Sequence, residues 1–101
     1  MAKRIIWSYR AQQDRKEILA YWISRNKSKT YSIKLNSLFI EAIELLSVHP
    51  LIGKKTEIEN VRIKIVRDYF ITYRILESTI EVLTIWDSRQ DPEKFREKVS
   101  L

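Results

Sequence analysis

The chain has 101 residues, 45% of them hydrophobic and 11% aromatic, which suffices for one compact core and is too short for two ordinary domains. It contains no cysteine, which excludes disulfides, thiol nucleophiles and thiolate metal sites. Lys and Arg number 19 against 13 Asp and Glu, and the net charge of +6 favours a polyanion or an acidic protein as partner. We therefore expect one domain over residues 1–101.

The N-terminal sequence "MAKRIIWSYR" does not resemble a signal peptide, because its apolar part is only Ile5-Ile6-Trp7. No apolar run in the chain approaches the roughly 20 residues that a membrane-spanning helix needs. The sequence therefore predicts a cytoplasmic protein without membrane contact.

The first half of the chain has the pattern of a strand followed by two amphipathic helices. Residues 3–9 form a β-branched and aromatic run that predicts a short strand. Ser8 is a suitable N-cap for a helix within "SYRAQQDRKEILAYWISRN". The apolar face predicted for this helix comprises Ala11, Arg15, Ile18 and Trp22, widened by Leu19 and Ile23.

A second helix follows the polar break "NKSK" and ends at His49-Pro50, because proline cannot continue a helix. Its predicted apolar stripe comprises Tyr31, Leu35, Leu38, Ala42 and Leu45, flanked by Phe39 and Leu46. The connection between the two helices is short, which favours an antiparallel helical hairpin.

The second half of the chain reads as a loop, three strands and a terminal helix. The loop is "HPLIGKKTEIEN", which holds the only glycine of the chain. The strand candidates are Val61–Val66, Tyr69–Leu76 and Ile80–Trp86, and the turns between them predict an antiparallel meander. Asp91-Pro92 then supplies the N-cap and first position of a short C-terminal helix.

These elements predict an α+β fold of order β-α-α-β-β-β, in which a two-helix hairpin covers one face of a small, mainly antiparallel sheet. On the first strand of the meander, Val61, Ile63 and Ile65 are expected to face the helices. The two-residue period of a strand then places Arg62 and Lys64 on the opposite, accessible face.

Five cations are the candidate functional residues, because gripping phosphate groups or stabilising the charge of RNA cleavage needs fixed guanidinium and ammonium groups. They are Arg62, Lys64 and Arg89, with Arg67 and Arg74 in an assisting role. The alternative interpretation is a solubilising edge of a small sheet.

Other polar residues have simpler interpretations. Tyr69 and Tyr73 suit base stacking or proton donation, yet strand tyrosines more often pack half-buried. His49 reads as a helix-end residue, and Asp87 and Asp91 read as turn and capping residues. The sequence shows no metal-ligand cluster, glycine-rich phosphate loop or Ser/His/Asp arrangement, so we expect no metal and no cofactor.

A family resemblance accounts for the element order together with three stretches of sequence. The loop "HPLIGK", the hairpin "VRIKIVRDYFITYRI" and the ending "IEVLTIWDSRQDPEKF" resemble the RelE/ParE superfamily of toxins from type II toxin–antitoxin systems. The resemblance covers nearly the whole chain and implies a toxin held inactive by a cognate antitoxin.

The RelE branch of this superfamily implies metal-independent, ribosome-dependent cleavage of mRNA, or a block of translation. By position, Arg62 and Lys64 match its paired cations on the first meander strand, and Arg89 matches its cation after the last strand. Phe70 stands where that branch has an essential Arg, and Phe95 stands near its C-terminal Tyr. The match therefore implies an incomplete nuclease site.

The ParE branch implies a different activity, the inhibition of DNA gyrase without catalysis. The stretch "VRDYFITYRI" is close to the hairpin of that branch, although its usual His before the final arginine pair is missing. The expected partners are thus the antitoxin and, as target, either the ribosome with its mRNA or DNA gyrase. A third alternative is a decayed toxin that only binds its antitoxin.

Overall fold

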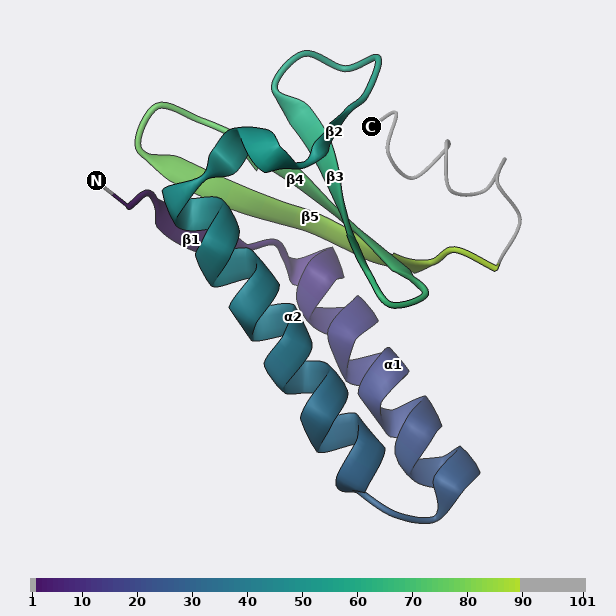
Figure 1. Cartoon of the computed structure of the whole chain (residues 1–101). Coiled ribbons are helices and arrows are strands. Elements are labelled where there is room, and N and C mark those ends of the chain that lie inside the picture. Colours follow the sequence, from purple (N-terminus) through teal and green to yellow (C-terminus); the bar gives the residue numbers. More distant parts are fainter. Residues whose placement is uncertain (1, 90–101) are drawn as a thin grey trace.

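The computed structural model describes residues 2–89, and its elements follow the predicted order (Figure 1). The elements are β1 (Arg4–Trp7), α1 (Tyr9–Asn26), α2 (Thr30–Val48), the 3-10 turn η1 (Pro50–Ile52), β2 (Lys54–Lys55), β3 (Val61–Val66), β4 (Tyr69–Ile75) and β5 (Thr79–Asp87). The α+β class and the helical hairpin are confirmed. The predicted C-terminal helix, with Asp91 and Phe95, lies outside the described residues.

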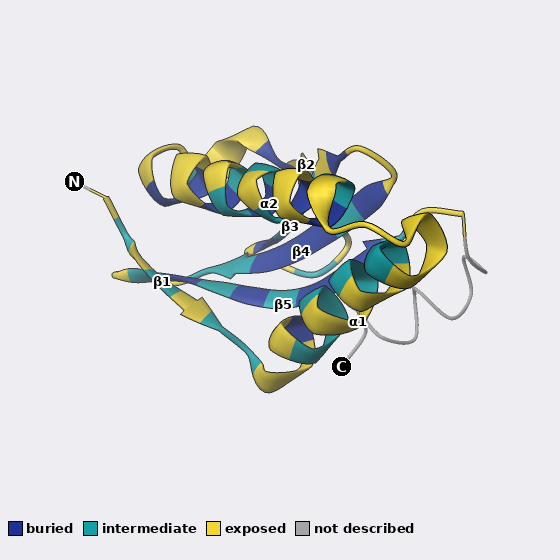
Figure 2. Ribbon diagram, turned by 90° about the horizontal axis from the view of Figure 1, so that it is seen from below, coloured by how far each residue is buried: buried dark blue, intermediate teal, exposed yellow. Residues whose placement is uncertain are grey.

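The five strands form one sheet in the order β1-β5-β4-β3-β2. β1 runs parallel to β5, and every other neighbouring pair is antiparallel. Both helices cover the same face of this sheet, and buried residues concentrate on β4, on β5 and on the helix faces turned toward them (Figures 1 and 2). The very short β2 and the turn η1 lie inside the predicted loop and were not expected from the sequence.

Ser8 fixes the point where the chain leaves the sheet and enters α1. Its side-chain oxygen accepts a hydrogen bond from the Ala11 backbone N–H at 3.0 Å, which confirms it as the N-cap. The same hydroxyl donates to the Leu83 carbonyl at 2.8 Å, and the Ser8 N–H donates to the Val82 carbonyl at 2.9 Å. The start of α1 is therefore tied directly to β5.

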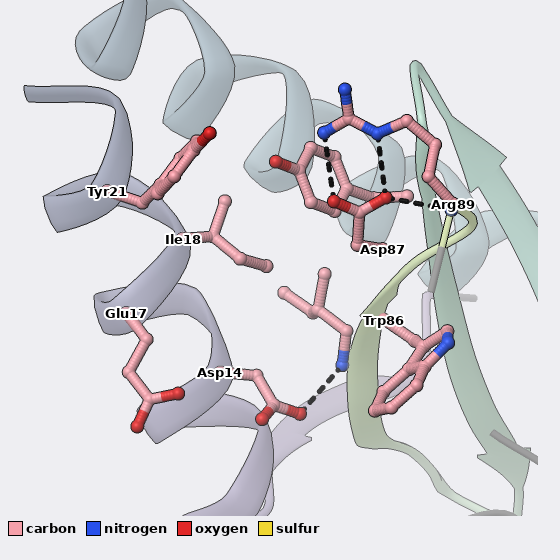
Figure 3. Close-up of a pocket in the computed structure, with 9 residues that line it drawn as sticks. Asp14, Glu17, Ile18, Tyr21, Trp86, Asp87 and Arg89 are labelled. Atoms are coloured by element: carbon pink, nitrogen blue, oxygen red, sulfur yellow. Dashed lines mark hydrogen bonds and ion pairs between the residues drawn. The ribbon is translucent and has the colours of Figure 1, made fainter. Parts of the chain in front are cut away.

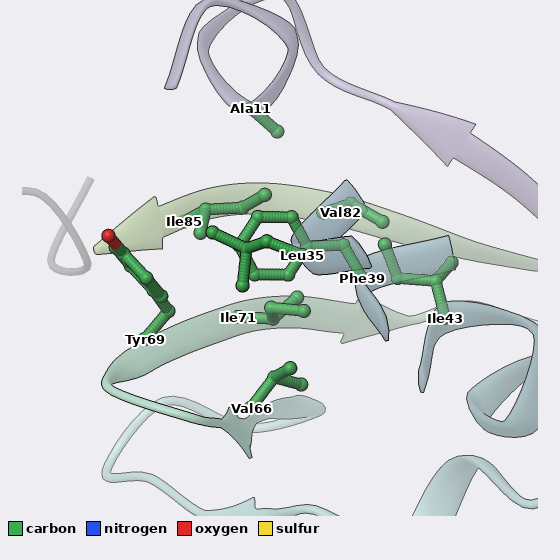
Figure 4. Packing of buried hydrophobic residues seen from close by; sticks show 9 residues of the cluster. All are labelled: Ala11, Leu35, Phe39, Ile43, Val66, Tyr69, Ile71, Val82 and Ile85. Atoms are coloured by element: carbon green, nitrogen blue, oxygen red, sulfur yellow. The ribbon is translucent and has the colours of Figure 1, made fainter. Parts of the chain in front are cut away.

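The core lies between the helices and β3 to β5 (Figure 4). Its fully buried residues on α2 are Leu35, Phe39, Ile43 and Leu46. The predicted stripe was displaced from this one, since Leu45 is 45% exposed. The predicted and the observed stripe both begin at Leu35, and after it the buried residues lie about one position later in each turn than predicted. Phe39, with its larger ring, packs against the sheet where Leu38 was expected.

The orientation predicted for β3 is wrong. Val66 packs in the core with Phe39 and Ile43 of α2, so Val66 faces the helices (Figure 4). By the two-residue period of a strand, Lys64 and Arg62 lie on the same face of the sheet as Val66. Lys64 pairs with Ile71 of β4, and Arg62 pairs with Tyr73. Both partners belong to the buried helix-facing side of the sheet.

The remaining β3 side chains therefore lie on the helix-free face. Ile65 is 45% exposed there, as expected for a side chain that the helices do not cover. β3 has only the two-residue β2 outside it, so it lies near the edge of the sheet. At such an edge, long basic side chains can share the helix-facing side without entering the core.

Tyr73 anchors η1 to the centre of the sheet. The phenol is fully buried, donates to the Pro50 carbonyl at 2.7 Å and accepts from the Gly53 N–H at 3.0 Å. A Cβ atom at position 53 would overlap the Tyr73 ring, so only glycine permits this close approach. The backbone after α2 is thus held against β4 by one side chain.

Tyr73→Phe is expected to destabilise the protein by about 1–3 kcal/mol for each backbone group that it leaves buried and unpaired. The change removes one oxygen and keeps the ring, so lost packing does not explain the effect. Urea unfolding followed by circular dichroism measures the difference. Tyr9→Phe is the control, because Tyr9 is 81% exposed and should shift the free energy of unfolding by less than about 0.5 kcal/mol. Equal unfolding midpoints for the two variants would contradict the anchoring role.

Candidate functional site

Arg62 is bound to the backbone of the turn after α2. Its guanidinium donates to the Leu51 carbonyl at 3.1 Å and to the Gly53 carbonyl at 2.8 Å. Charge-assisted hydrogen bonds of this kind hold a side chain more firmly than neutral ones. The cation that the sequence places first among the catalytic candidates therefore supports the same turn as its cross-strand partner Tyr73.

Arg89 is paired with a carboxylate two residues before it. Its guanidinium makes two hydrogen bonds to the Asp87 carboxylate, at 3.0 and 2.9 Å, and the Arg89 N–H donates a third at 2.9 Å. These bonds hold the pKa of Asp87 below its ordinary value, and the same pairing raises the pKa of the exposed Arg89. Asp87 thus fills the turn role that the sequence predicted for it.

Arg74 lies on the helix-free face, away from Arg62 and Lys64. It is paired across the strands with Glu81, and its guanidinium lies 3.5 Å from that carboxylate. Both side chains are partly exposed, so this ion pair contributes little to stability. The pairing with Glu81 holds the Arg74 guanidinium on the helix-free face, away from Arg62 and Lys64.

Lys64 and Arg67 are the two candidates whose side chains make no hydrogen bond or ion pair within residues 2–89. Lys64 is half-buried beside Ile71, whereas Arg67 is exposed at the tip of the β3–β4 hairpin with a left-handed φ of 57°. The Ser88 N–H donates to the Asp68 carbonyl, so the hairpin tip and the segment with Arg89 share one end of the sheet. The five cations are consequently spread over both faces and one end.

Tyr69 is a buried bridge between the sheet and α1. Its hydroxyl accepts a hydrogen bond from the Trp22 indole N–H at 2.8 Å, and its ring meets Phe39 edge-on at 5.6 Å. Burial raises the pKa of Tyr69, and burial also raises the pKa of Tyr73. Both phenols therefore keep their protons at neutral pH.

A pocket of about 330 Å³ opens between α1 and the end of β5 (Figure 3). It is lined by Asp14, Glu17, Ile18, Tyr21, Tyr69, Ile85, Trp86, Asp87 and Arg89. The Asp14 carboxylate accepts from the Ile85 N–H at 3.1 Å, so it satisfies a donor on the edge of β5 beyond the end of β1. This pocket combines carboxylates, phenols and one arginine, and is not a basic phosphate site.

The sequence interpretation missed this pocket because it followed only the apolar face of the first helix. Asp14, Glu17 and Tyr21 recur at i, i+3 and i+7, a spacing that places polar side chains on one side of a helix. That spacing was visible in the sequence, but the partner strand was not. The register of β5 against β4 is what brings Asp87 beside this helix.

The remaining expectations concern His49, metals and membranes. His49 is the C-cap residue of α2, and its N–H donates to the Leu45 carbonyl at 2.8 Å, as expected for a helix end. Within residues 2–89, no group of three or more His, Asp or Glu side chains is arranged to hold a metal ion. Neither helix of the described chain has an apolar stretch that would cross a lipid bilayer.

Comparisons with known proteins identify the class of the protein as a RelE/ParE superfamily toxin. The model of the ParE toxin of type II toxin–antitoxin systems (parDE) matches residues 5–92. The chain therefore belongs to the ParE toxin family, and it is the toxin component of a type II toxin–antitoxin system, with a cognate antitoxin as partner.

A solved structure supports the same fold. A chain of the chromosomal ParDE toxin–antitoxin system from P. aeruginosa superposes with a TM-score of 0.71 and 17% sequence identity. The match covers 83% of this chain and 94% of that one. A comparison with curated protein sequences finds no match.

The free energy of unfolding should distinguish the role of Arg62 from that of Lys64. Arg62→Ala removes two hydrogen bonds to backbone carbonyls and should lower the free energy of unfolding by about 1–3 kcal/mol. Lys64→Ala removes a side chain that makes no such bond in the described chain and should change it by less than about 1 kcal/mol. Denaturant titration of both variants tests this. If Arg62→Ala unfolds at the wild-type midpoint, the contacts with Leu51 and Gly53 contribute nothing.

The pKa of Asp87 should depend on Arg89. A carboxylate with a depressed pKa adds stability above its unfolded pKa, and this stability is lost as the pH falls through the folded pKa. In Arg89→Ala, the Asp87 pKa should rise toward its ordinary value of 3.8, since the guanidinium hydrogen bonds, the largest cause of its lowering, are gone while the bond from the backbone N–H of residue 89 remains. Carboxyl NMR across the acidic range measures this value. Lys64→Ala serves as the control and should leave it unchanged.

Proposed function

We propose that this toxin arrests growth by binding a protein target, and that this target is DNA gyrase, as the ParE branch implies. The observation that supports the proposal is the separation of the five cations. Arg62 serves a backbone turn, Arg89 serves Asp87 and Arg74 pairs with Glu81 on the other face of the sheet.

Cleavage of RNA places a different demand on a site. The phosphorane formed when a 2'-hydroxyl attacks its neighbouring phosphate needs several donors that converge on one group of oxygens. Cations already held by carbonyls or carboxylates would have to break those bonds before they could reach a phosphate. The burial of Tyr69 and Tyr73 also argues against cleavage. Burial raises the pKa of both phenols, so they stay protonated and are poorly suited to deprotonate the attacking hydroxyl.

Ribosome-dependent mRNA cleavage is the second candidate, and one observation favours it. The side chains of Lys64 and Arg67 make no hydrogen bond or ion pair within residues 2–89, and both residues lie on the β3–β4 hairpin. Two cations without a partner of their own suit the binding of a nucleic-acid backbone. They suffice for affinity, whereas in-line cleavage needs further groups.

The order in which macromolecular syntheses stop tests the proposal. When this chain is induced alone in bacteria, labelled thymidine incorporation should fall within minutes and before labelled methionine incorporation. The double variant Lys64→Ala/Arg67→Ala should still arrest growth, since neither cation acts in catalysis. An earlier fall of protein synthesis, abolished in that double variant, would establish the RNA-directed alternative instead.

A further inference from the structure

The turn after α2 presents apolar side chains to solvent on a backbone that is held rigidly. Leu51 is 66% exposed and Ile52 is 48% exposed, and Val48 at the end of α2 is 55% exposed. The turn lies beside β2 at the end of the helical hairpin (Figure 1). We call Val48, Leu51 and Ile52 the apolar knob.

Four hydrogen bonds hold the backbone of the knob, and all come from two neighbouring side chains of the sheet. Tyr73 binds the Pro50 carbonyl and the Gly53 N–H, while Arg62 binds the Leu51 and Gly53 carbonyls. Rigid presentation lowers the entropy that a partner must lose on binding, which is the usual advantage of a preorganised contact surface.

A pocket of about 310 Å³ lies beside the knob, between η1 and the loop that joins β2 to β3. Leu51, Ile58 and Ile75 supply apolar walls, and Lys55 and Arg62 supply cations. Glu59 is the carboxylate among the described lining residues. The lining thus combines apolar walls with two cations against one carboxylate, and Lys55 and Arg62 form its positive rim.

The charge of the surrounding chain selects the kind of partner. The pocket lining has two cations, Lys55 and Arg62, against one carboxylate, Glu59. The adjoining Lys54 and Glu57 balance each other, and the whole chain carries a net charge of +6. An acidic segment with apolar anchors would find complementary charge next to apolar surface that is already ordered. These are the features of a site for a segment that folds as it binds.

We propose that the apolar knob and its pocket form an anchor site for an acidic segment of the cognate antitoxin, which inserts one large apolar side chain beside Leu51. The proposal rests on the proposed function, in that a toxin of this kind is neutralised by its antitoxin. It specifies which surface the antitoxin must reach.

Titration of the purified toxin with the full-length cognate antitoxin is the direct test. Leu51→Asp should weaken binding at least about 30-fold, the effect of losing an interface hot spot. Ile33→Asp is the matched control, because Ile33 is 64% exposed near the other end of α2, and it should change the affinity less than about 3-fold. Equal affinities of Leu51→Asp and the wild type, or an equal loss in both variants, would overturn the proposal.

A charge reversal tests the positive rim separately. Lys55→Glu should weaken binding and reduce its salt dependence, whereas Lys34→Glu on the exposed side of α2 should do less. Both lysines are exposed, so neither change threatens the fold. If the two variants weaken binding equally, the attraction is a property of the overall charge and the rim has no special role.

Growth assays separate this inference from the proposed function. Leu51→Asp should arrest growth even when the antitoxin is co-expressed, while the wild type is rescued. A variant that binds the antitoxin normally but has lost toxicity would assign the knob to the target, which overturns the proposed occupant. If the wild type itself does not arrest growth, the proposed function fails, and the titration still decides the antitoxin site.

Discussion

The buried phenol of Tyr73 is the interaction on which the arrangement of the helix-facing side depends. It is fully buried at the centre of the sheet, and its oxygen satisfies both a carbonyl and an N–H of the turn after α2. Glycine at position 53 is required for this approach, and Arg62, paired across the strands with Tyr73, completes the support. Because a buried polar group without a partner is costly, the turn, the ring and the guanidinium are retained or lost together.

Periodicity predicted the helices, the meander and the fold class, since each long element repeats its apolar residues at its own period. It failed on β3, where alternation offered three apolar residues on one side and only Val66 on the other. Packing of Val66 in the cluster that includes Phe39 decided the orientation, although Val61 on the opposite side is also buried. The short β2 escaped notice since two residues carry no periodic signal.

The candidate site was predictable only as a set of residue types. Nothing in the sequence shows that Arg62 would meet the carbonyls of Leu51 and Gly53, because those contacts depend on the turn that Tyr73 holds. The pairing of Arg74 with Glu81 follows from a strand register that shifts at Thr72/Tyr73, an irregularity that alternation alone does not locate. The basic composition indicated a positively charged surface. In the structure, the five candidate cations lie on both faces and at one end of the sheet.

The same distribution supports the proposal that this surface is used for binding and not for catalysis. A catalytic site for phosphate chemistry gathers its donors before the substrate arrives, because reorganising them during the reaction would cost the rate they provide. Here the fixed donors, Tyr73 and Arg62, converge on the protein's own backbone at a turn whose side chains point to solvent. What is preorganised is therefore an apolar contact surface with a positive rim, which is the kind of surface that the proposed binding of the antitoxin requires.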